Sequence, residues 1–153
     1  MKIQEEDPGT TDVRALLLEH LAAMRTHSPP ESVHALDIDA LRLPAITFWT
    51  VRENDELLGC GGLKQLNVES AEIKSMKTAS AHHRKGVARL LLSHILDVAK
   101  ERKLEYLLLE TGTPEAFVPA RRLYERHGFV ECEPFADYKR DPYSVFMRCD
   151  IAV

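Results

Sequence analysis

The sequence predicts an α/β (α+β) fold in which a mixed, mostly antiparallel sheet of about six to seven strands has helices on both faces. The chain has 153 residues, of which 44% are hydrophobic, and this suits a single domain with one sizeable core. Short runs rich in β-branched and aromatic residues alternate with segments of helical periodicity. Together these observations indicate a layered fold of sheet and helices.

The first half of the chain is expected to form a strand, a helix and a meander of three strands. Residues 1–6 have the pattern of a short strand, and a helix that Thr10 or Thr11 can cap follows and runs to about residue 27. Residues 28–44 are expected to form a loop with one short helix around 37–41. The antiparallel strands of the meander are expected at residues 46–51, 57–66 and 71–78.

The second half of the chain alternates helix and strand. Apolar residues recur at helical spacing over 87–102, and the apolar run at 106–109 is typical of a parallel strand that is buried on both faces. A second helix is expected over 114–127 and should end at Gly128, because glycine readily takes the left-handed conformation beyond a helix. The closing strands are expected at residues 129–132 and 144–149.

Composition and charge limit the classes of function. A net charge of -4 without a long basic run argues against a nucleic-acid partner. The apolar stretches are too short to cross a membrane and the acidic start differs from a secretory signal, so we expect a cytoplasmic protein. The 3 widely spaced cysteines are expected to be buried free thiols, and no histidine cluster suggests a metal site. A small-molecule partner and a monomer or homodimer are expected.

The most informative segment is a basic turn with one glycine ahead of an amphipathic helix. Residues 83–88 read HRKGVA, and the N–H groups of a first helical turn lack internal partners, so such a turn can bind an anion. Gly86 permits a close approach of the backbone to a phosphate. Positive charge is added by Arg84, Lys85 and Arg89. The alternative, a tight turn with solvated basic side chains, stays open.

These motifs resemble those of the GNAT superfamily of acyl-CoA-dependent N-acetyltransferases. The family signature is Q/R-x-x-G-x-G/A at a strand-to-helix turn, and the chain matches it except for His83, where the family usually has arginine or glutamine. A second family feature, L-Y-x-x-x-G-F, is present as LYERHGF over residues 123–129. The resemblance covers most of the chain and implies one N-acetyltransferase domain over residues 1–153.

The resemblance also implies acetyl-CoA as the cosubstrate. In the family, the backbone amides of the signature bind the pyrophosphate, and the preceding strand hydrogen-bonds the pantetheine arm as it would an added strand. Divergence of two central strands would leave the edge groups next to residues 71–78 free for this purpose. The implied cofactor-binding residues are Met76, Lys77, Thr78, His83, Arg84, Lys85, Gly86, Val87, Ala88 and Arg89.

Acetyl transfer to an amine needs a proton acceptor, because an alkylamine is mostly protonated at neutral pH. Glu72 is the first candidate, since it precedes the basic turn in an Ala-Glu-Ile setting that some protein-acetylating family members share. The alternative is a glutamate that faces solvent from its strand. Tyr124 matches the family's acid, which protonates the leaving thiolate, and the alternative is a tyrosine whose ring only packs.

The resemblance implies an acyltransferase that moves an acetyl group from acetyl-CoA to a primary amine, with a small-molecule amine or amino acid favoured. Two alternatives stay open: a protein lysine or N-terminal acetyltransferase, and a regulatory domain that binds acyl-CoA without turnover. Residues 28–44 and 137–143 are expected to shape the acceptor pocket. The candidate acceptor contacts are Asp37, Asp39, Phe135, Asp137, Tyr138 and Tyr143.

Overall fold

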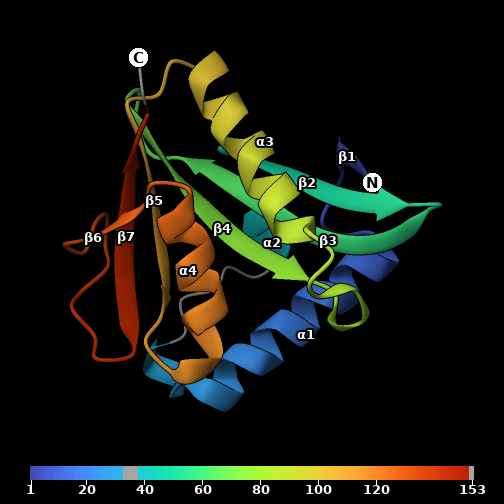
Figure 1. Ribbon diagram of the computed structural model, residues 1–153, viewed down its shortest axis with the longest axis horizontal. Helices are drawn as coiled ribbons and strands as arrows, with labels where there is room; N and C mark the ends of the chain where they lie inside the picture. The colour runs from blue at the N-terminus through green and yellow to red at the C-terminus, as the bar shows by residue number, and fades with distance from the viewer. Residues whose placement is uncertain (33–37, 152–153) are drawn as a thin grey trace.

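A seven-stranded sheet forms the centre of the protein in the computed structural model, which describes residues 1–32 and 38–151 (Figure 1). The strand order is β1-β2-β3-β4-β5-β7-β6, and β4 with β5 is the parallel pair among antiparallel neighbours. This confirms the mixed, mostly antiparallel sheet. The strands are β1 (Lys2–Glu5), β2 (Ile46–Glu53), β3 (Glu56–Gln65), β4 (Ser70–Thr78), β5 (Tyr106–Gly112), β6 (Val130–Cys132) and β7 (Ser144–Asp150).

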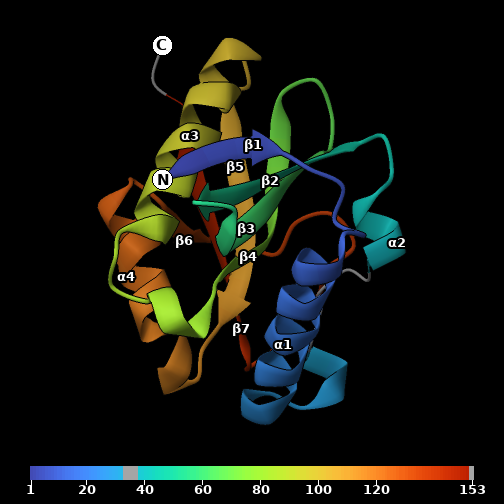
Figure 2. The ribbon, with the colours of Figure 1, turned by 90° about the vertical axis from the view of Figure 1, so that its right-hand side faces the viewer.

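Helices cover both faces of the sheet, as the sequence predicts. Figure 2 shows α3 and α4 on one face and α1 and α2 on the other. The helices are α1 (Thr11–His27), α2 (Ile38–Leu41), α3 (Val87–Glu101) and α4 (Val118–Arg126), with 3-10 turns at η1 (Pro30–Ser32), η2 (Ser80–His82) and η3 (Glu115–Phe117). Within the described residues, no helix is both long and apolar enough to span a bilayer.

The alternation of side chains along the strands gives the sheet two apolar faces. Phe48 and Trp49 are consecutive in β2 and therefore point to opposite faces. Trp49 belongs to the core under α3, together with Leu91, whereas Phe48 packs with Leu16 and Leu17 of α1. Because helices cover both faces, the central strands need apolar residues on both sides, which explains the continuous apolar run in β5.

The helix that ends at Gly128 begins later than the sequence predicts. Helical structure was expected from residue 114, but residues 115–117 form the 3-10 turn η3 and α4 begins at Val118. Pro119 explains the difference, because proline lacks an N–H group and is tolerated only in the first turn of a helix. Gly128 has φ 93, which confirms the left-handed end. The other predicted elements are present within a few residues, although position 37 of the short predicted helix lies outside the described residues.

Strands β4 and β5 separate after a short paired region, as expected for two diverging central strands. They pair only over residues 70–72 of β4 and 106–108 of β5, and beyond this point they run apart (Figure 1). Ser75 has φ 55, and the β3–β4 register shifts between Cys60 and Gly62, so β4 is bulged where it leaves β5. The sheet is therefore open between the carboxyl ends of β4 and β5.

Candidate active site

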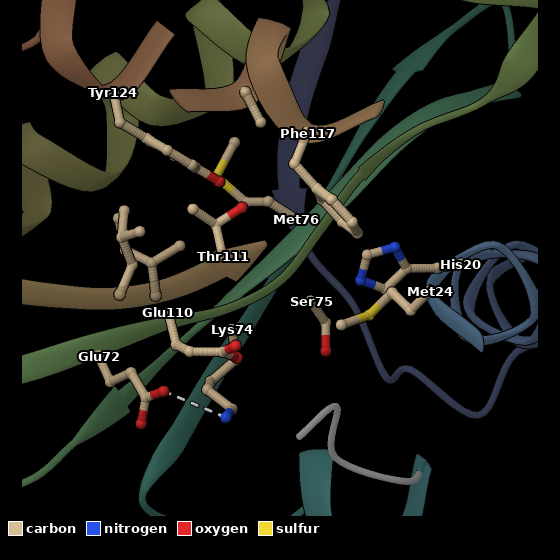
Figure 3. A pocket seen from close by; sticks show the side chains of 13 residues that line it. His20, Met24, Glu72, Lys74, Ser75, Met76, Glu110, Thr111, Phe117 and Tyr124 are labelled. Carbon is tan, nitrogen blue, oxygen red and sulfur yellow. Dashed lines mark hydrogen bonds and ion pairs between the residues drawn. The ribbon is translucent and has the colours of Figure 1, made fainter. Parts of the chain in front are cut away.

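A pocket occupies the opening between β4 and β5 and reaches both faces of the sheet (Figure 3). Phe117 and Tyr124 enter it from the α4 side, whereas His20 and Met24 enter it from α1. The polar residues that the strands contribute are Glu72, Lys74, Ser75, Glu110 and Thr111. A ligand in this pocket can therefore contact groups from both layers of helices.

The basic turn ahead of α3 has the geometry expected of an anion-binding site. Gly86 is the N-cap of α3 and has a left-handed backbone with φ 82. Among the residues that the structure describes, the N–H groups of residues 87–89 have no hydrogen-bond acceptor, and Leu90 is the first to donate, to the Gly86 carbonyl at 3.0 Å. The exposed basic side chains around the turn are Arg84, Lys85 and Arg89.

His83 connects this turn to the end of β4. Its Nε2 lies 3.3 Å from the carbonyl oxygen of Thr78, to which a protonated Nε2 can donate. Lys85 contacts the residue three positions before it, with its Nζ 3.1 Å from Nδ1 of His82. The structure thus brings the residues predicted to bind the cofactor, 76–78 and 83–89, together at the carboxyl end of β4 (Figure 1).

Glu72 is buried in a group of three polar side chains. It is only 3% exposed, so the alternative of a solvent-facing glutamate is wrong. Its Oε2 accepts hydrogen bonds from the Tyr138 hydroxyl at 2.6 Å and from Lys74 Nζ at 3.1 Å. Burial, and then the negative charge of Glu72, raise the pKa of Tyr138 above its ordinary value. Tyr138 therefore stays protonated and donates to the carboxylate.

Tyr124 is also buried, and its hydroxyl points into the pocket (Figure 3). The ring packs edge-on against Phe129, with 5.7 Å between ring centroids. Burial raises the pKa of Tyr124 to about 12, so the phenol keeps its proton near neutral pH. Its oxygen makes no hydrogen bond to the described part of the chain. This proton is therefore available to a ligand.

His20 lines the pocket but was not identified from the sequence. Burial, and then the nearby charge of Lys77, lower the pKa of His20 to about 4, so the imidazole is neutral near pH 7. Helical periodicity placed residue 20 beside the apolar face of α1, yet it could not show that this face borders the opening in the sheet.

We expect His20 to make the folded protein less stable in acid. The unfolded chain protonates this histidine near about pH 6.5, whereas the folded chain does so only near about pH 4. The unfolded state thus binds more protons in this range, and the free energy of unfolding decreases as the pH falls through it. His20→Gln, which does not titrate, should flatten the dependence. Melting temperatures of both proteins from about pH 4 to pH 7.5 test this, and parallel curves would contradict it.

Sequence reasoning missed Lys74 and Glu110, although a signal for the first was available. Lys74 follows Glu72 by two positions, and such residues share one face of a strand. Glu110 reaches the same pocket only because β5 pairs in parallel with β4. Among the candidate acceptor contacts, Tyr138 donates a hydrogen bond to Glu72 and packs edge-on against Phe135, with 5.1 Å between ring centroids. The described candidates all lie outside the lining of the pocket, namely Asp39, Phe135, Asp137, Tyr138 and Tyr143, and position 37 lies outside the described residues.

The cysteines are free thiols, as predicted. Cys60 and Cys149 are buried and Cys132 is partly buried. Burial raises the pKa of Cys60 to about 12, so its thiol is unreactive near neutral pH. In the described ranges, no group of three or more His, Cys, Asp or Glu side chains is arranged to hold a metal ion.

The chain is similar to known acetyltransferases over most of its length. The model of the "Acetyltransferase (GNAT) family" matches residues 13–129. The uncharacterized N-acetyltransferase YsnE of Bacillus subtilis (strain 168) is 54% identical over 147 residues, which are 96% of this chain and 97% of the relative. The uncharacterized N-acetyltransferase YedL of Escherichia coli (strain K12) is 50% identical over 145 residues, or 95% and 91% of the two chains.

The fold is also similar to that of a solved structure. A GNAT family acetyltransferase from Elizabethkingia anophelis, crystallised with acetyl-CoA bound, superposes with a TM-score of 0.69 at 19% identity, covering 97% of both chains. At this level of identity, the likeness concerns the fold.

Proposed function

Because the chain belongs to the GNAT family of acetyltransferases, we propose that it transfers an acetyl group from acetyl-CoA to a primary amine of a small molecule. Family membership confirms the resemblance found in the sequence and makes the protein an acyltransferase. The observation that carries the proposal is the pocket between β4 and β5, where Tyr124 and Glu72 approach one opening from opposite faces of the sheet.

The opening in the sheet has features that suit acetyl-CoA. The unpaired N–H groups of residues 87–89 and the basic side chains around them suit the pyrophosphate. Residues 76–78 of β4 have no partner in β5, so their free edge suits the amides of the pantetheine arm. The thioester would then lie in the pocket near Met76 and Tyr124. Acetyl-CoA in the Elizabethkingia structure supports the same class of ligand for this fold.

The side chains around the pocket support direct transfer. Glu72 accepts a proton from the acceptor's ammonium group, directly or through water, and the neutral nitrogen attacks the thioester carbonyl. A backbone N–H of β4 near Met76 stabilises the oxyanion of the tetrahedral intermediate. When the C–S bond breaks, Tyr124 donates its proton to the coenzyme A thiolate. The attacking nitrogen loses its second proton as the acetamide forms, and through water this proton restores the Tyr124 phenol, while Glu72 releases the first proton to solvent. The products are the acetamide and coenzyme A.

Tyr124→Phe is expected to lower turnover by about 10-fold or more with little change in stability. The substitution deletes the hydroxyl, which has no partner among the described residues, and keeps the ring that packs on Phe129. Turnover of acetyl-CoA and the melting temperature should be measured on the same preparations. Wild-type turnover would leave Tyr124 with a packing role only.

The acceptor class can be tested by measuring thiol release from acetyl-CoA across a panel of amines, amino acids and peptides. We expect the highest kcat/KM for a small amine or amino acid, because the pocket has a volume of only about 110 Å³ and is lined by residues from helices on both faces of the sheet. Faster turnover of lysine-containing or N-terminal peptides would favour a protein acetyltransferase instead. Binding of acetyl-CoA without thiol release from any acceptor would favour a regulatory domain.

A further inference from the structure

We propose that Lys74 and Tyr138 are positioning residues, which hold the Glu72 carboxylate so that one chosen oxygen faces the acceptor amine. The inference rests on the proposed role of Glu72 as the proton acceptor. Lys74 and Tyr138 act through Glu72 and need not touch the substrate. The argument starts from the geometry of these three side chains.

The three side chains form a closed ring of hydrogen bonds. Lys74 Nζ donates to the Tyr138 hydroxyl at 2.7 Å and to Glu72 Oε2 at 3.1 Å, and the hydroxyl donates to the same Oε2 at 2.6 Å. The last distance is typical of a phenol bonded to an ionised carboxylate. The side chains of Lys74 and Glu72 are only 8% and 4% exposed, so water has little access to replace these bonds.

Both donors act on one oxygen of the carboxylate. Oε2 of Glu72 accepts hydrogen bonds from Lys74 and Tyr138, whereas Oε1 accepts none from the described parts of the chain. With Oε2 fixed, the carboxylate cannot rotate freely, and Oε1 is the oxygen left to accept a proton. Because a displacement of about 1 Å can cost about 10²-fold in rate, such fixation matters for a proton acceptor.

Stability alone does not account for this arrangement. A buried ion pair loses its hydration, and apolar side chains of similar volume often serve stability equally well or better. Lys74 and Glu72 nevertheless share one face of β4 at the border of the pocket. A polar group kept in such a place is better explained by the orientation that it gives to a functional side chain.

Tyr138 is held in place independently of its hydroxyl. It belongs to the loop between β6 and β7, and lies 66 positions from Glu72 in the sequence. Its ring packs against Phe135 and Phe146, with centroid distances of 5.1 and 5.4 Å. Tyr138→Phe should therefore keep the loop docked while it removes one of the two donors to Oε2.

The test is a double-mutant cycle between Tyr138 and Glu72, read out as kcat and KM with the fastest acceptor of the amine panel. Tyr138→Phe should lower kcat by about 10-fold, with KM for acetyl-CoA unchanged. In the Glu72→Gln background, the same change should cost nothing further, because Tyr138 acts through that carboxylate. Tyr106→Phe, in which the tyrosine lies under Arg148 away from the pocket, serves as the matched control.

Lys74→Met provides a second, independent arm. It removes a donor and the charge beside a buried carboxylate, so a larger loss of kcat than in Tyr138→Phe is expected, measured at a temperature where the variant is folded. The positioning role would be overturned if Tyr138→Phe and Lys74→Met both kept wild-type kcat. It would also be overturned if their losses added to the loss in Glu72→Gln, and in either case the proposed role of Glu72 would stand. Wild-type kcat in Glu72→Gln would instead overturn the proposed role of Glu72, on which this inference rests.

Discussion

Glu72→Gln is expected to lower turnover by about 10²- to 10⁴-fold and to leave acetyl-CoA binding intact. The amide has nearly the same volume, and its carbonyl oxygen can still accept the hydrogen bonds of Lys74 and Tyr138. It cannot accept a proton from the acceptor amine near neutral pH. The loss should therefore appear in kcat, whereas the KM for acetyl-CoA should stay close to that of the wild type.

The Glu72→Gln assay needs two controls, one for lost stability and one for the general effect of removing a negative charge. Removing one charge of a buried ion pair can cost about 3–5 kcal/mol, so turnover should be compared well below the melting temperature of the variant. Glu69→Gln changes an exposed glutamate just before β4 and should leave turnover unchanged. Wild-type turnover of Glu72→Gln at every pH would remove this residue from the mechanism.

Gly86→Glu is expected to abolish the rise in melting temperature that acetyl-CoA causes. At a ligand concentration of about 100 times Kd, binding should stabilise the wild type by about 2.7 kcal/mol, or roughly 5–10 °C in a domain of this size. The new carboxylate would lie beside the N–H groups of residues 87–89, where the pyrophosphate is proposed to bind. Repulsion between the two negative groups should prevent binding.

Gly86→Asn separates this charge effect from backbone strain. Gly86 has φ 82, a conformation that asparagine tolerates better than most residues, and a Cβ there would have only Arg89 nearby, at 3.6 Å. The asparagine variant should keep most of the acetyl-CoA shift, whereas the glutamate variant should show none although it folds. A full shift in a folded Gly86→Glu protein would place the phosphate site elsewhere.

Much of the candidate site could be predicted because its signals are local. The glycine and basic residues of the turn, the strand that precedes it and the Tyr124 motif are each recognisable within a few positions. His20, Glu110 and Tyr138 have no such local signal. They meet Glu72 and Lys74 only after α1, β5 and the β6–β7 loop pack around the opening in the sheet.

The sequence by itself determined the local conformations, because helical periodicity, strand alternation and turn chemistry act over a few residues. It placed the helices and strands, and it identified Gly86 and Gly128 as the glycines that flank α3 and α4 at turns of the backbone. Only the tertiary structure decided that β4 and β5 pair over three residues and then separate, and that Glu72 is buried with Lys74 and Tyr138. The burial and the electrostatic surroundings of a side chain depend on contacts between distant residues, such as that of Tyr138 with Glu72 across 66 positions. No local pattern specifies which distant side chain will exclude water from a given carboxylate.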